Sequence, residues 1–197
     1  MDLLQLMREA REQLQPNWLL AIGVSLVYGM LVGLPSELNS YGELLSFLLA
    51  GPLQMGLCIF FLKIVNSETP VFFDLFEGFK PLLQVLLAYA VITLLTILGL
   101  VFFIIPGIII SLGFSMTFYI LAERPDTPFN EAIQESWNLT NGYKMELFIL
   151  HLRFIPWYLL GLLFLIVGIF VVVPWHQLSI AKYYKYLTEQ PVSNRNL

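Results

Sequence analysis

Stretches without a charged side chain dominate the pattern of this sequence. Four of them are about as long as a membrane-spanning helix or longer, and they cover residues 13–36, 44–62, 81–122 and 154–181. A helix needs about 20 apolar residues to cross a hydrocarbon core of ~30 Å. The first two stretches therefore predict one spanning helix each.

The third stretch is too long for a single crossing. As one helix rising ~1.5 Å per residue, it would reach about 63 Å. Ile105, Pro106 and Gly107 lie near its middle, where proline removes a helix donor and glycine tolerates a turn. We predict a hairpin of two helices there, over residues 82–104 and 106–122.

The fourth stretch fits one tilted crossing, but the apolar character begins earlier, and residues 145–181 are nearly long enough for two. Charge favours two, because basic residues collect on the cytoplasmic side of a membrane. With six crossings and both termini cytoplasmic, Arg153 is the one basic residue not placed inside, whereas five crossings would put Lys182, Lys185 and Arg195 on the opposite face. The outside loops, which hold no Lys or Arg, would be residues 35–43, about 103–107 and about 165–170.

The segment before each predicted hairpin follows one plan. An amphipathic stretch precedes a Pro or Gly and then an aromatic residue, which is Trp18, Phe79 or Tyr143, at spacings of 61 and 64. A period of this size is typical of a repeat architecture. We predict an all-α polytopic membrane protein with six transmembrane helices in three hairpins, each preceded by an amphipathic interfacial helix. The single domain would cover residues 1–189, with repeats at about 1–63, 64–124 and 125–189 and a C-terminal tail at 190–197.

The three amphipathic stretches each place apolar residues on one helical face. The faces are Leu3, Leu6, Met7, Ala10 and Leu14; Phe72, Leu75, Phe76 and Phe79; and Phe129, Ala132, Ile133, Ser136 and Thr140. These helices are too short and polar to span, so we expect them in the plane of the interface. Their polar faces are acidic or balanced, which favours struts packed against the hairpins. The alternative is a docking surface for membrane or cytoplasmic protein partners.

Composition supports the membrane assignment and excludes several other classes. Hydrophobic residues make up 58% of the chain and charged residues 12%, with a mean hydropathy of +0.77, whereas a soluble domain has about 25% charged residues. A net charge of −4 argues against nucleic acid as a partner. Cys58 is the single cysteine, so no intrachain disulfide forms and no Cys/His spacing predicts a metal site. Residues 1–15 lack the apolar core of a cleaved signal peptide.

The polar residues His151, Arg153 and His176 form the one unusual set within the apolar stretches. An Arg in mid-span costs about 2.5–3.5 kcal/mol on insertion scales, so it needs a physical reason. One hypothesis is that the three residues bind an anionic lipid headgroup or carboxylate. The other is that Arg153 snorkels to the interface or pairs with Glu146 or an acid of an interfacial helix.

Small residues recur at a spacing of four along the first predicted span. They are Ala21, Ser25, Gly29 and Gly33. Such a stripe lets helix backbones approach closely in lipid. We expect it to pack within the chain, and the alternative is that it forms a homo-oligomer, most simply a homodimer.

Several short motifs occur in a fixed order along the chain. They are Gly51-Pro52-Leu53-x-x-Gly56, Asp74-Leu75-Phe76-x-Gly78-Phe79, Pro106-Gly107-Ile108, Tyr119-x-Leu121-Ala122-Glu123, Glu131-Ala132-Ile133-x-x-Ser136, Gly142-x-Lys144 and Ala181-x-Tyr183-Tyr184. Over residues 1–189 the chain resembles a widespread family of bacterial integral membrane proteins of unknown function, and it is similar to the membrane domain of some glycerophosphodiester phosphodiesterases. The resemblance implies a location in the bacterial cytoplasmic (inner) membrane and supplies no activity, cofactor or catalytic residue. The chain departs from the family pattern at Gln15-Pro16-Asn17-Trp18 and at His151 and Arg153.

Catalytic motifs such as G-x-S-x-G, H-E-x-x-H or a Gly-rich phosphate loop do not occur in the sequence. We therefore predict a non-enzymatic inner-membrane protein, without a cofactor, that binds membrane lipid or membrane partners in a scaffold or accessory role. The alternative is a small transporter or exporter component, because Pro52, Pro106 and Pro174 recur at matching places, as interrupted helices do in transporters. An intramembrane enzyme is the third hypothesis and has the weakest support.

Overall fold

The computed structural model describes residues 2–37, 40–163 and 167–190, and this part of the chain is helical with no β-strand. The α-helices are α1 Leu3–Leu14, α2 Trp18–Gly33, α3 Ser40–Val65, α4 Leu82–Phe102, α5 Ile104–Phe114, α6 Thr117–Glu123, α7 Phe129–Leu139, α8 Lys144–Leu163 and α9 Val167–Glu189. Short 3-10 helices are η1 Gln15–Asn17, η2 Pro35–Glu37 and η3 Phe72–Phe79. The all-helical prediction is thus confirmed for these residues. The predicted tail at 190–197 lies outside them apart from Gln190, as do parts of the predicted loops at 35–43 and 165–170.

Neighbouring helices pair along the chain: α2 packs against α3, α4 against α5, and α8 against α9. In two of these pairs glycines bring the backbones into contact. A Cβ added at Gly99 would lie 2.9 Å from Cα of Gly107, and one added at Gly161 would lie 2.8 Å from the carbonyl carbon of Gly168. Such close approach is a feature of helix packing in lipid. No hydrophobic effect drives helices together there, and small residues let the backbones pack closely.

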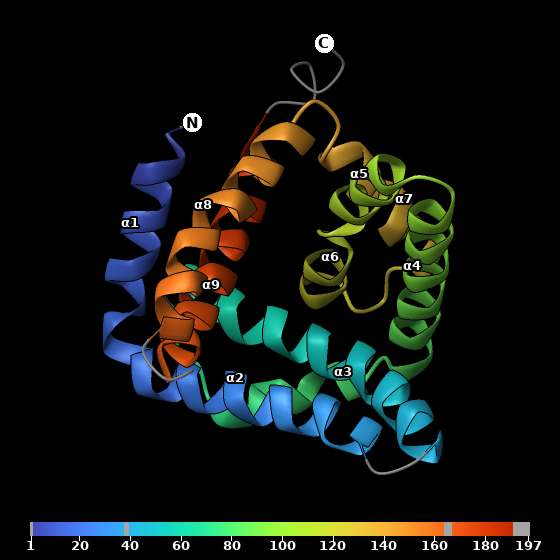
Figure 1. Cartoon of the computed structure of the whole chain (residues 1–197), viewed down its shortest axis with the longest axis horizontal. Coiled ribbons are helices and arrows are strands. Elements are labelled where there is room, and N and C mark those ends of the chain that lie inside the picture. Colours follow the sequence, from blue (N-terminus) through green and yellow to red (C-terminus); the bar gives the residue numbers. More distant parts are fainter. Residues whose placement is uncertain (1, 38–39, 164–166, 191–197) are drawn as a thin grey trace.

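Helix α3 is the centre of the fold, because it packs against α2, α4, α6, α9 and η3. Figure 1 shows α1, α8 and α9 side by side at the left of the molecule, with α2 and α3 below and α4 at the right. The largest fully buried side chains include Phe60 and Phe61 of α3 and Tyr183 and Tyr184 of α9. The core therefore lies around the second half of α3, where the three helix pairs meet.

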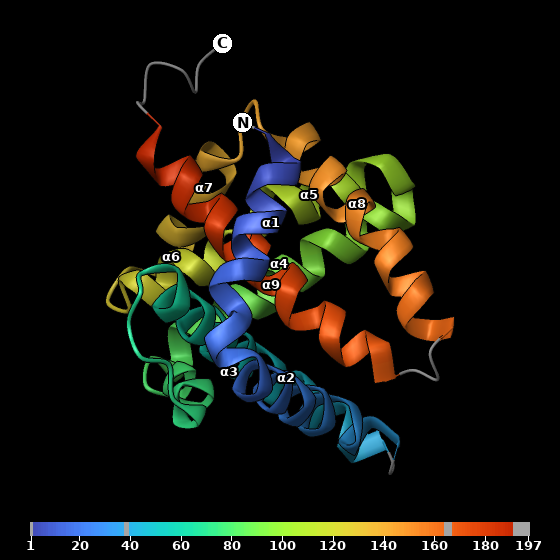
Figure 2. The same cartoon turned by 90° about the vertical axis from the view of Figure 1, so that its left-hand side faces the viewer.

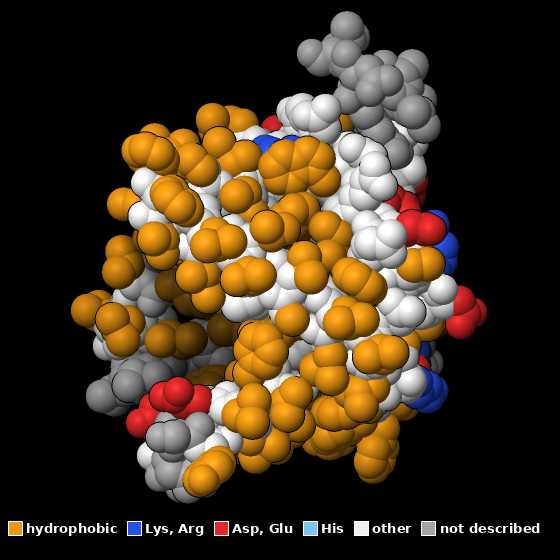
Figure 3. All heavy atoms as spheres, turned by 90° about the vertical axis from the view of Figure 1, so that its right-hand side faces the viewer, with side chains coloured by type: hydrophobic (Ala, Val, Ile, Leu, Met, Phe, Trp, Pro, Cys, Tyr) orange, Lys and Arg blue, Asp and Glu red, His pale blue; other side chains and the backbone are white. Residues whose placement is uncertain are grey.

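Within the described residues, five helices are long and apolar enough to cross a membrane: Leu3–Gly33, Tyr41–Val65, Leu82–Phe102, Ile104–Glu123 and Lys144–Leu163. Most of the apolar window of α3 is buried, whereas only a small part of that in α4 is. Figure 3 shows a broad hydrophobic face with charged side chains of both signs along its right-hand edge and acidic side chains at its lower left. These features are consistent with a multi-pass membrane protein. Helix α9 is not among the five, since His176, Gln177 and Lys182 lower its hydropathy.

Helix α1 buries the face that its sequence period predicts. Its buried residues are Leu3, Leu6, Met7, Ala10 and Leu14. The helix packs on α9, where the indole Nε1–H of Trp175 donates to the carbonyl of Met7 at 2.7 Å. Nε2 of Gln13 also donates to the carbonyl of Ile64 at 2.7 Å, at the end of α3. The first helix is therefore held by residues from two distant parts of the chain.

The second amphipathic segment differs from the prediction because η3 is a 3-10 helix. With three residues per turn, residues three apart share a face, so Phe73, Phe76 and Phe79 align, with successive ring centroids 6.5 and 6.4 Å apart. Phe76, expected in the buried stripe, is 38% exposed. The buried residues of η3 are Asp74, Leu75 and Gly78.

Two of the sequence motifs interlock where η3 lies on α3. A Cβ at Gly56 would come within 1.8 Å of the carbonyl oxygen of Leu75, and one at Gly78 within 2.0 Å of that of Pro52. The fully buried Asp74 accepts a hydrogen bond from Nζ of Lys63 at 2.6 Å and from the backbone N–H of Val71 at 2.8 Å. The motif glycines are thus explained by backbone contact between the two segments.

The middle hairpin differs from the prediction in two places. Its turn is at Phe103, which is extended, so Pro106 lies in the first turn of α5, where its missing N–H costs nothing. The predicted helix over 106–122 is interrupted between α5 and α6, at Ser115 and Met116. There the hydroxyl of Ser136 in α7 donates to the carbonyl of Gly113 at 2.9 Å and accepts from the N–H of Met116 at 3.2 Å. A side chain inserted into the helical ladder is a known cause of such a break.

Candidate functional site

Two histidines predicted as site residues meet between α8 and α9. The ring centroids of His151 and His176 lie 5.0 Å apart. Nδ1 of His151 lies 2.8 Å from the carbonyl of Leu147, and since a carbonyl only accepts, this nitrogen carries the proton. Oη of Tyr158 lies 2.9 Å from Nδ1 of His176, while Nε2 of His176 is buried and has no hydrogen-bond partner. We call His151, Tyr158 and His176 the histidine cluster.

Arg153, the third predicted residue, lies apart from the histidine cluster. Two residues along an α-helix correspond to a rotation of about 200°, so His151 and Arg153 flank the buried face of α8 on opposite sides. That face consists of Leu147, Leu150 and Phe154. The structure therefore divides the predicted set of three residues into two separate places.

The flank of α8 that holds Arg153 also holds Trp157, which contacts a second tryptophan on α9. Trp157 follows one turn later on α8, and its ring centroid lies 5.1 Å from that of Trp175 in α9. The guanidinium carbon of Arg11 in α1 lies 5.7 Å from the centroid of the same Trp175 ring. We call Arg11, Arg153, Trp157 and Trp175 the arginine–tryptophan cluster. Sequence analysis missed Arg11, although its place four residues after the buried Met7 was a signal that it borders the packed face.

The two arginines of this cluster have no acidic partner within 4.0 Å in the described part of the chain. Nη1 of Arg153 is buried and makes no hydrogen bond there. The pairing with Glu146 considered from the sequence is not among the ion pairs of the described residues. Glu146 accepts a hydrogen bond from Oη of Tyr183 at 3.1 Å. A buried guanidinium nitrogen without an acceptor is costly, and it calls for an anion.

The predicted small-residue stripe divides into two halves. Ala21 and Ser25 are buried, at 0% and 7% exposure, as expected for packing within the chain. A Cβ at Gly29 or Gly33 would have no atom of another segment within 4 Å, and both glycines line a groove of about 340 Å³ with Phe170. Among the described residues, this half of the stripe therefore makes no close helix contact at Gly29. Its role in a homodimer stays a prediction.

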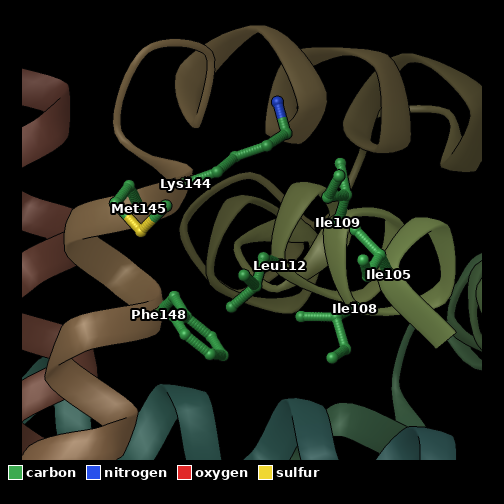
Figure 4. A pocket seen from close by; sticks show the side chains of 7 residues that line it. All are labelled: Ile105, Ile108, Ile109, Leu112, Lys144, Met145 and Phe148. Atoms are coloured by element: carbon green, nitrogen blue, oxygen red, sulfur yellow. The ribbon is translucent and has the colours of Figure 1, made fainter.

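An apolar cavity of about 300 Å³ lies between α5 and α8 (Figure 4). Its lining residues are Ile105, Ile108, Ile109, Leu112, Lys144, Met145 and Phe148. Nζ of Lys144 lies 4.2 Å from the ring centroid of Trp137 in α7, which is a cation–π distance. Sequence analysis did not find this cavity, because its walls belong to two different hairpins.

The part of the chain that the structure describes contains no group of three or more His, Cys, Asp or Glu side chains that could hold a metal ion. The histidine cluster supplies two imidazoles and a phenol. Its hydrogen bonds and ring contacts, including the stacking of Phe154 on His176 at 4.4 Å, join α8 to α9 within the apolar region.

Comparison with known protein families gives one match. Residues 90–191 match the family described as "Protein of unknown function (DUF975)". No curated protein and no solved structure matches the chain. The matched residues include the histidine cluster, Arg153 and the cavity, but not Arg11. The similarity to the membrane domain of some glycerophosphodiester phosphodiesterases stays a prediction.

Proposed function

We propose that this chain, which belongs to the DUF975 family of proteins of unknown function, is a non-enzymatic multi-pass membrane protein that binds anionic phospholipid. The observation that carries this proposal is the arginine–tryptophan cluster, where a partly buried Arg153 has an unpaired nitrogen. The lipid phosphate would lie against the guanidinium groups of Arg153 and Arg11. Binding of this kind fits a scaffold or accessory role in the bacterial inner membrane.

The topology that we propose has six crossings in three repeats, each an amphipathic segment followed by a helix pair, with both termini cytoplasmic. Support for the sixth crossing comes from the glycine contact of α8 with α9, which resembles that of α4 with α5. In Figure 2 the end of α2 and the start of α3, and likewise the end of α8 and the start of α9, lie at the right, away from α6 and α7. The basic residues follow the positive-inside rule with this arrangement.

Arg153 reaches a lipid phosphate only if its side chain extends back toward the cytoplasmic end of α8, because the residue lies deep in the span. It lies nine residues after Lys144, which is about 13 Å along a straight helix. A guanidinium at that depth is expensive unless it is paired. Its planar donors match two phosphate oxygens at once, which an ammonium does not. The bilayer itself offers such an anion to a side chain on the outer flank of α8.

Arg11 gives the proposed phosphate site a second cation. The indole of Trp175 lies beside Arg11 and contacts Trp157, which follows Arg153 by one turn of α8, and its N–H already donates to the carbonyl of Met7. The ring is therefore a wall of the site and not a donor to the ligand. An anion within reach of both arginines would accept charge-assisted hydrogen bonds from α1 and from α8.

The proposal is tested by lipid retention. The purified protein and its variants are mixed with phosphatidylglycerol or phosphatidylcholine in detergent and examined by native mass spectrometry. A charge-assisted hydrogen bond contributes about 1.5–3 kcal/mol, so Arg153→Gln should weaken phosphatidylglycerol binding by roughly tenfold or more, and Arg11→Gln should act in the same direction. Arg8→Gln, an exposed position on the same helix, is the matched control. Equal retention in all four proteins, or equal retention of both lipids by the wild type, contradicts the proposal.

We interpret the amphipathic segments as structural struts that pack against the hairpins. Several of their acids are paired within the chain: Glu9 with Lys182 at 3.3 Å, and Glu135 with Arg124. Glu123, just after the middle hairpin, pairs with Lys185 and accepts from Oη of Tyr184 at 2.8 Å. These pairs leave less charge for a protein partner, which supports a layer that stiffens the hairpins.

A transporter component is the second candidate, and one observation favours it. The interruption between α5 and α6 lies within a candidate spanning segment, as broken helices do around transport sites. However, side chains of α7 already satisfy the backbone groups at this break. Solute flux into liposomes that contain the purified protein separates the two functions, since a lipid-binding scaffold moves no solute.

A further inference from the structure

We propose that the cavity between α5 and α8 binds the hydrocarbon chain of a long-chain fatty acid, with the carboxylate beside Lys144. This site is independent of the proposed phospholipid site, because the two share no residue. Arg153 lies on the flank of α8 that turns toward Trp175 in α9, whereas Met145 and Phe148 turn toward α5.

The walls of the cavity are entirely aliphatic or aromatic apart from Lys144. Four residues of α5 face Met145 and Phe148 of α8, as Figure 4 shows. The volume of about 300 Å³ is at the lower end of the range for ligand pockets. Such a volume holds part of a single hydrocarbon chain, whose remainder would extend past Ile105 into the bilayer, and it excludes the two chains of a phospholipid side by side.

The cavity has one charged end. Ile105 and Leu112 mark its extent along α5, and seven residues of helix correspond to about 10.5 Å. A Cβ at Gly113, next to Leu112, would lie 3.3 Å from Cε of Lys144. The ammonium therefore adjoins the Leu112 end, and the Ile105 end is apolar. A cavity with one cationic end and one apolar end matches an amphiphile that has a single hydrocarbon chain and an anionic group at its end.

Lys144 is held in place without being neutralised. Its ammonium lies over the Trp137 ring, and Gly113 leaves room for that ring, since a Cβ there would come within 2.4 Å of it. No acidic side chain lies within 4.0 Å of Lys144 among the described residues. A carboxylate joined directly to the chain would reach this ammonium, whereas the phosphate of a lysophospholipid is set further from its chain by the glycerol.

The first test is photolabelling of the purified full-length protein in detergent with palmitic acid that carries a diazirine in its chain. We expect labelled peptides that contain Leu112, Met145 or Phe148. Leu112→Trp fills the cavity and should reduce this labelling at least tenfold. Leu94→Trp, at an exposed position of α4, is the matched control and should label as the wild type does. Unchanged labelling of the Leu112→Trp protein overturns the proposal.

The second test concerns the charged end and does not depend on a filled cavity. Unlabelled palmitic acid should compete with the probe at a concentration at least tenfold lower than hexadecanol does. Lys144→Gln should remove that difference, and Lys144→Arg should retain it. Equal competition by the acid and the alcohol in the wild type overturns the proposal, and so does stronger competition by a lysophospholipid. Arg153→Gln should leave palmitic acid labelling unchanged, so the two lipid sites can fail separately.

Discussion

Alanine at Gly56 tests whether backbone contact between α3 and η3 holds the fold together. A Cβ at this position would lie 1.8 Å from the carbonyl oxygen of Leu75, and Cβ atoms essentially never come within 3.0 Å of such an atom. The segment η3 must therefore move by more than 1 Å. The obstacle is backbone, which cannot rotate away as a flexible side chain does.

The size of the effect follows from two opposing contributions. Replacing Gly by Ala inside a helix favours the helix by about 0.8–1.0 kcal/mol. Overpacking of a well-packed site costs typically 1–3 kcal/mol and occasionally more, and a clash with backbone belongs at the upper end. We expect Gly56→Ala to destabilise the protein by about 2 kcal/mol. Gly29→Ala, where a Cβ meets open space, should leave stability unchanged or raise it by up to ~1 kcal/mol.

The lone cysteine provides a second assay for this difference in stability. Cys58 is 2% exposed and faces Tyr119 of α6, on the side of α3 that is turned away from Gly56 and η3. Maleimide reaches such a thiol only when the core opens, so labelling should be faster in the less stable Gly56→Ala than in the wild type and no faster in Gly29→Ala. Thermal unfolding in detergent gives the global comparison. Wild-type stability and labelling in Gly56→Ala would refute the claim that the motif glycine exists for this contact.

Three further predictions concern other parts of the chain. Asp74→Ala should destabilise by about 2–4 kcal/mol, because it leaves a lysine and a backbone N–H without their buried acceptor; unfolding in detergent measures this, and Asp74→Asn should lose less. Ser136→Ala should cost roughly 1–3 kcal/mol, since it unpairs the groups at the helix break, and unchanged stability would mean that the break is set elsewhere. Reporter fusions after Ala122 and after Leu187 should both give a cytoplasmic signal, and an outside signal at the second position would favour five crossings.

The spacing of apolar residues predicted those elements that are determined by their local sequence. The buried face of α1 follows from apolar residues spaced three and four apart. Trp175 binds to a face that the helix forms by itself. The segment at η3 was harder, because its apolar residues fit both a spacing of three and a spacing of four. Asp74 decides between them, since it is drawn inward to Lys63, which no local pattern reveals.

Features that depend on distant partners were not predictable in the same way. The break after Ser115 is made by a hydroxyl twenty residues further along, and the cavity by side chains of two hairpins. The separation of Arg153 from His151 is different, because the rotation of about 200° between them follows from helix geometry alone. That part of the candidate site could have been placed correctly from the sequence.

The bond from Trp175 to Met7 joins residues 168 positions apart, and this has a consequence for biosynthesis. Ribosomes add about 5–20 residues per second, so α1 waits roughly 8–34 s for the helix on which it packs. During that time its buried face lacks the helix on which most of it packs. The surface of the bilayer is the natural place to shelter it, because an amphipathic helix rests there reversibly. Helix α1 would thus lie on the membrane surface until α9 is inserted and packs against it.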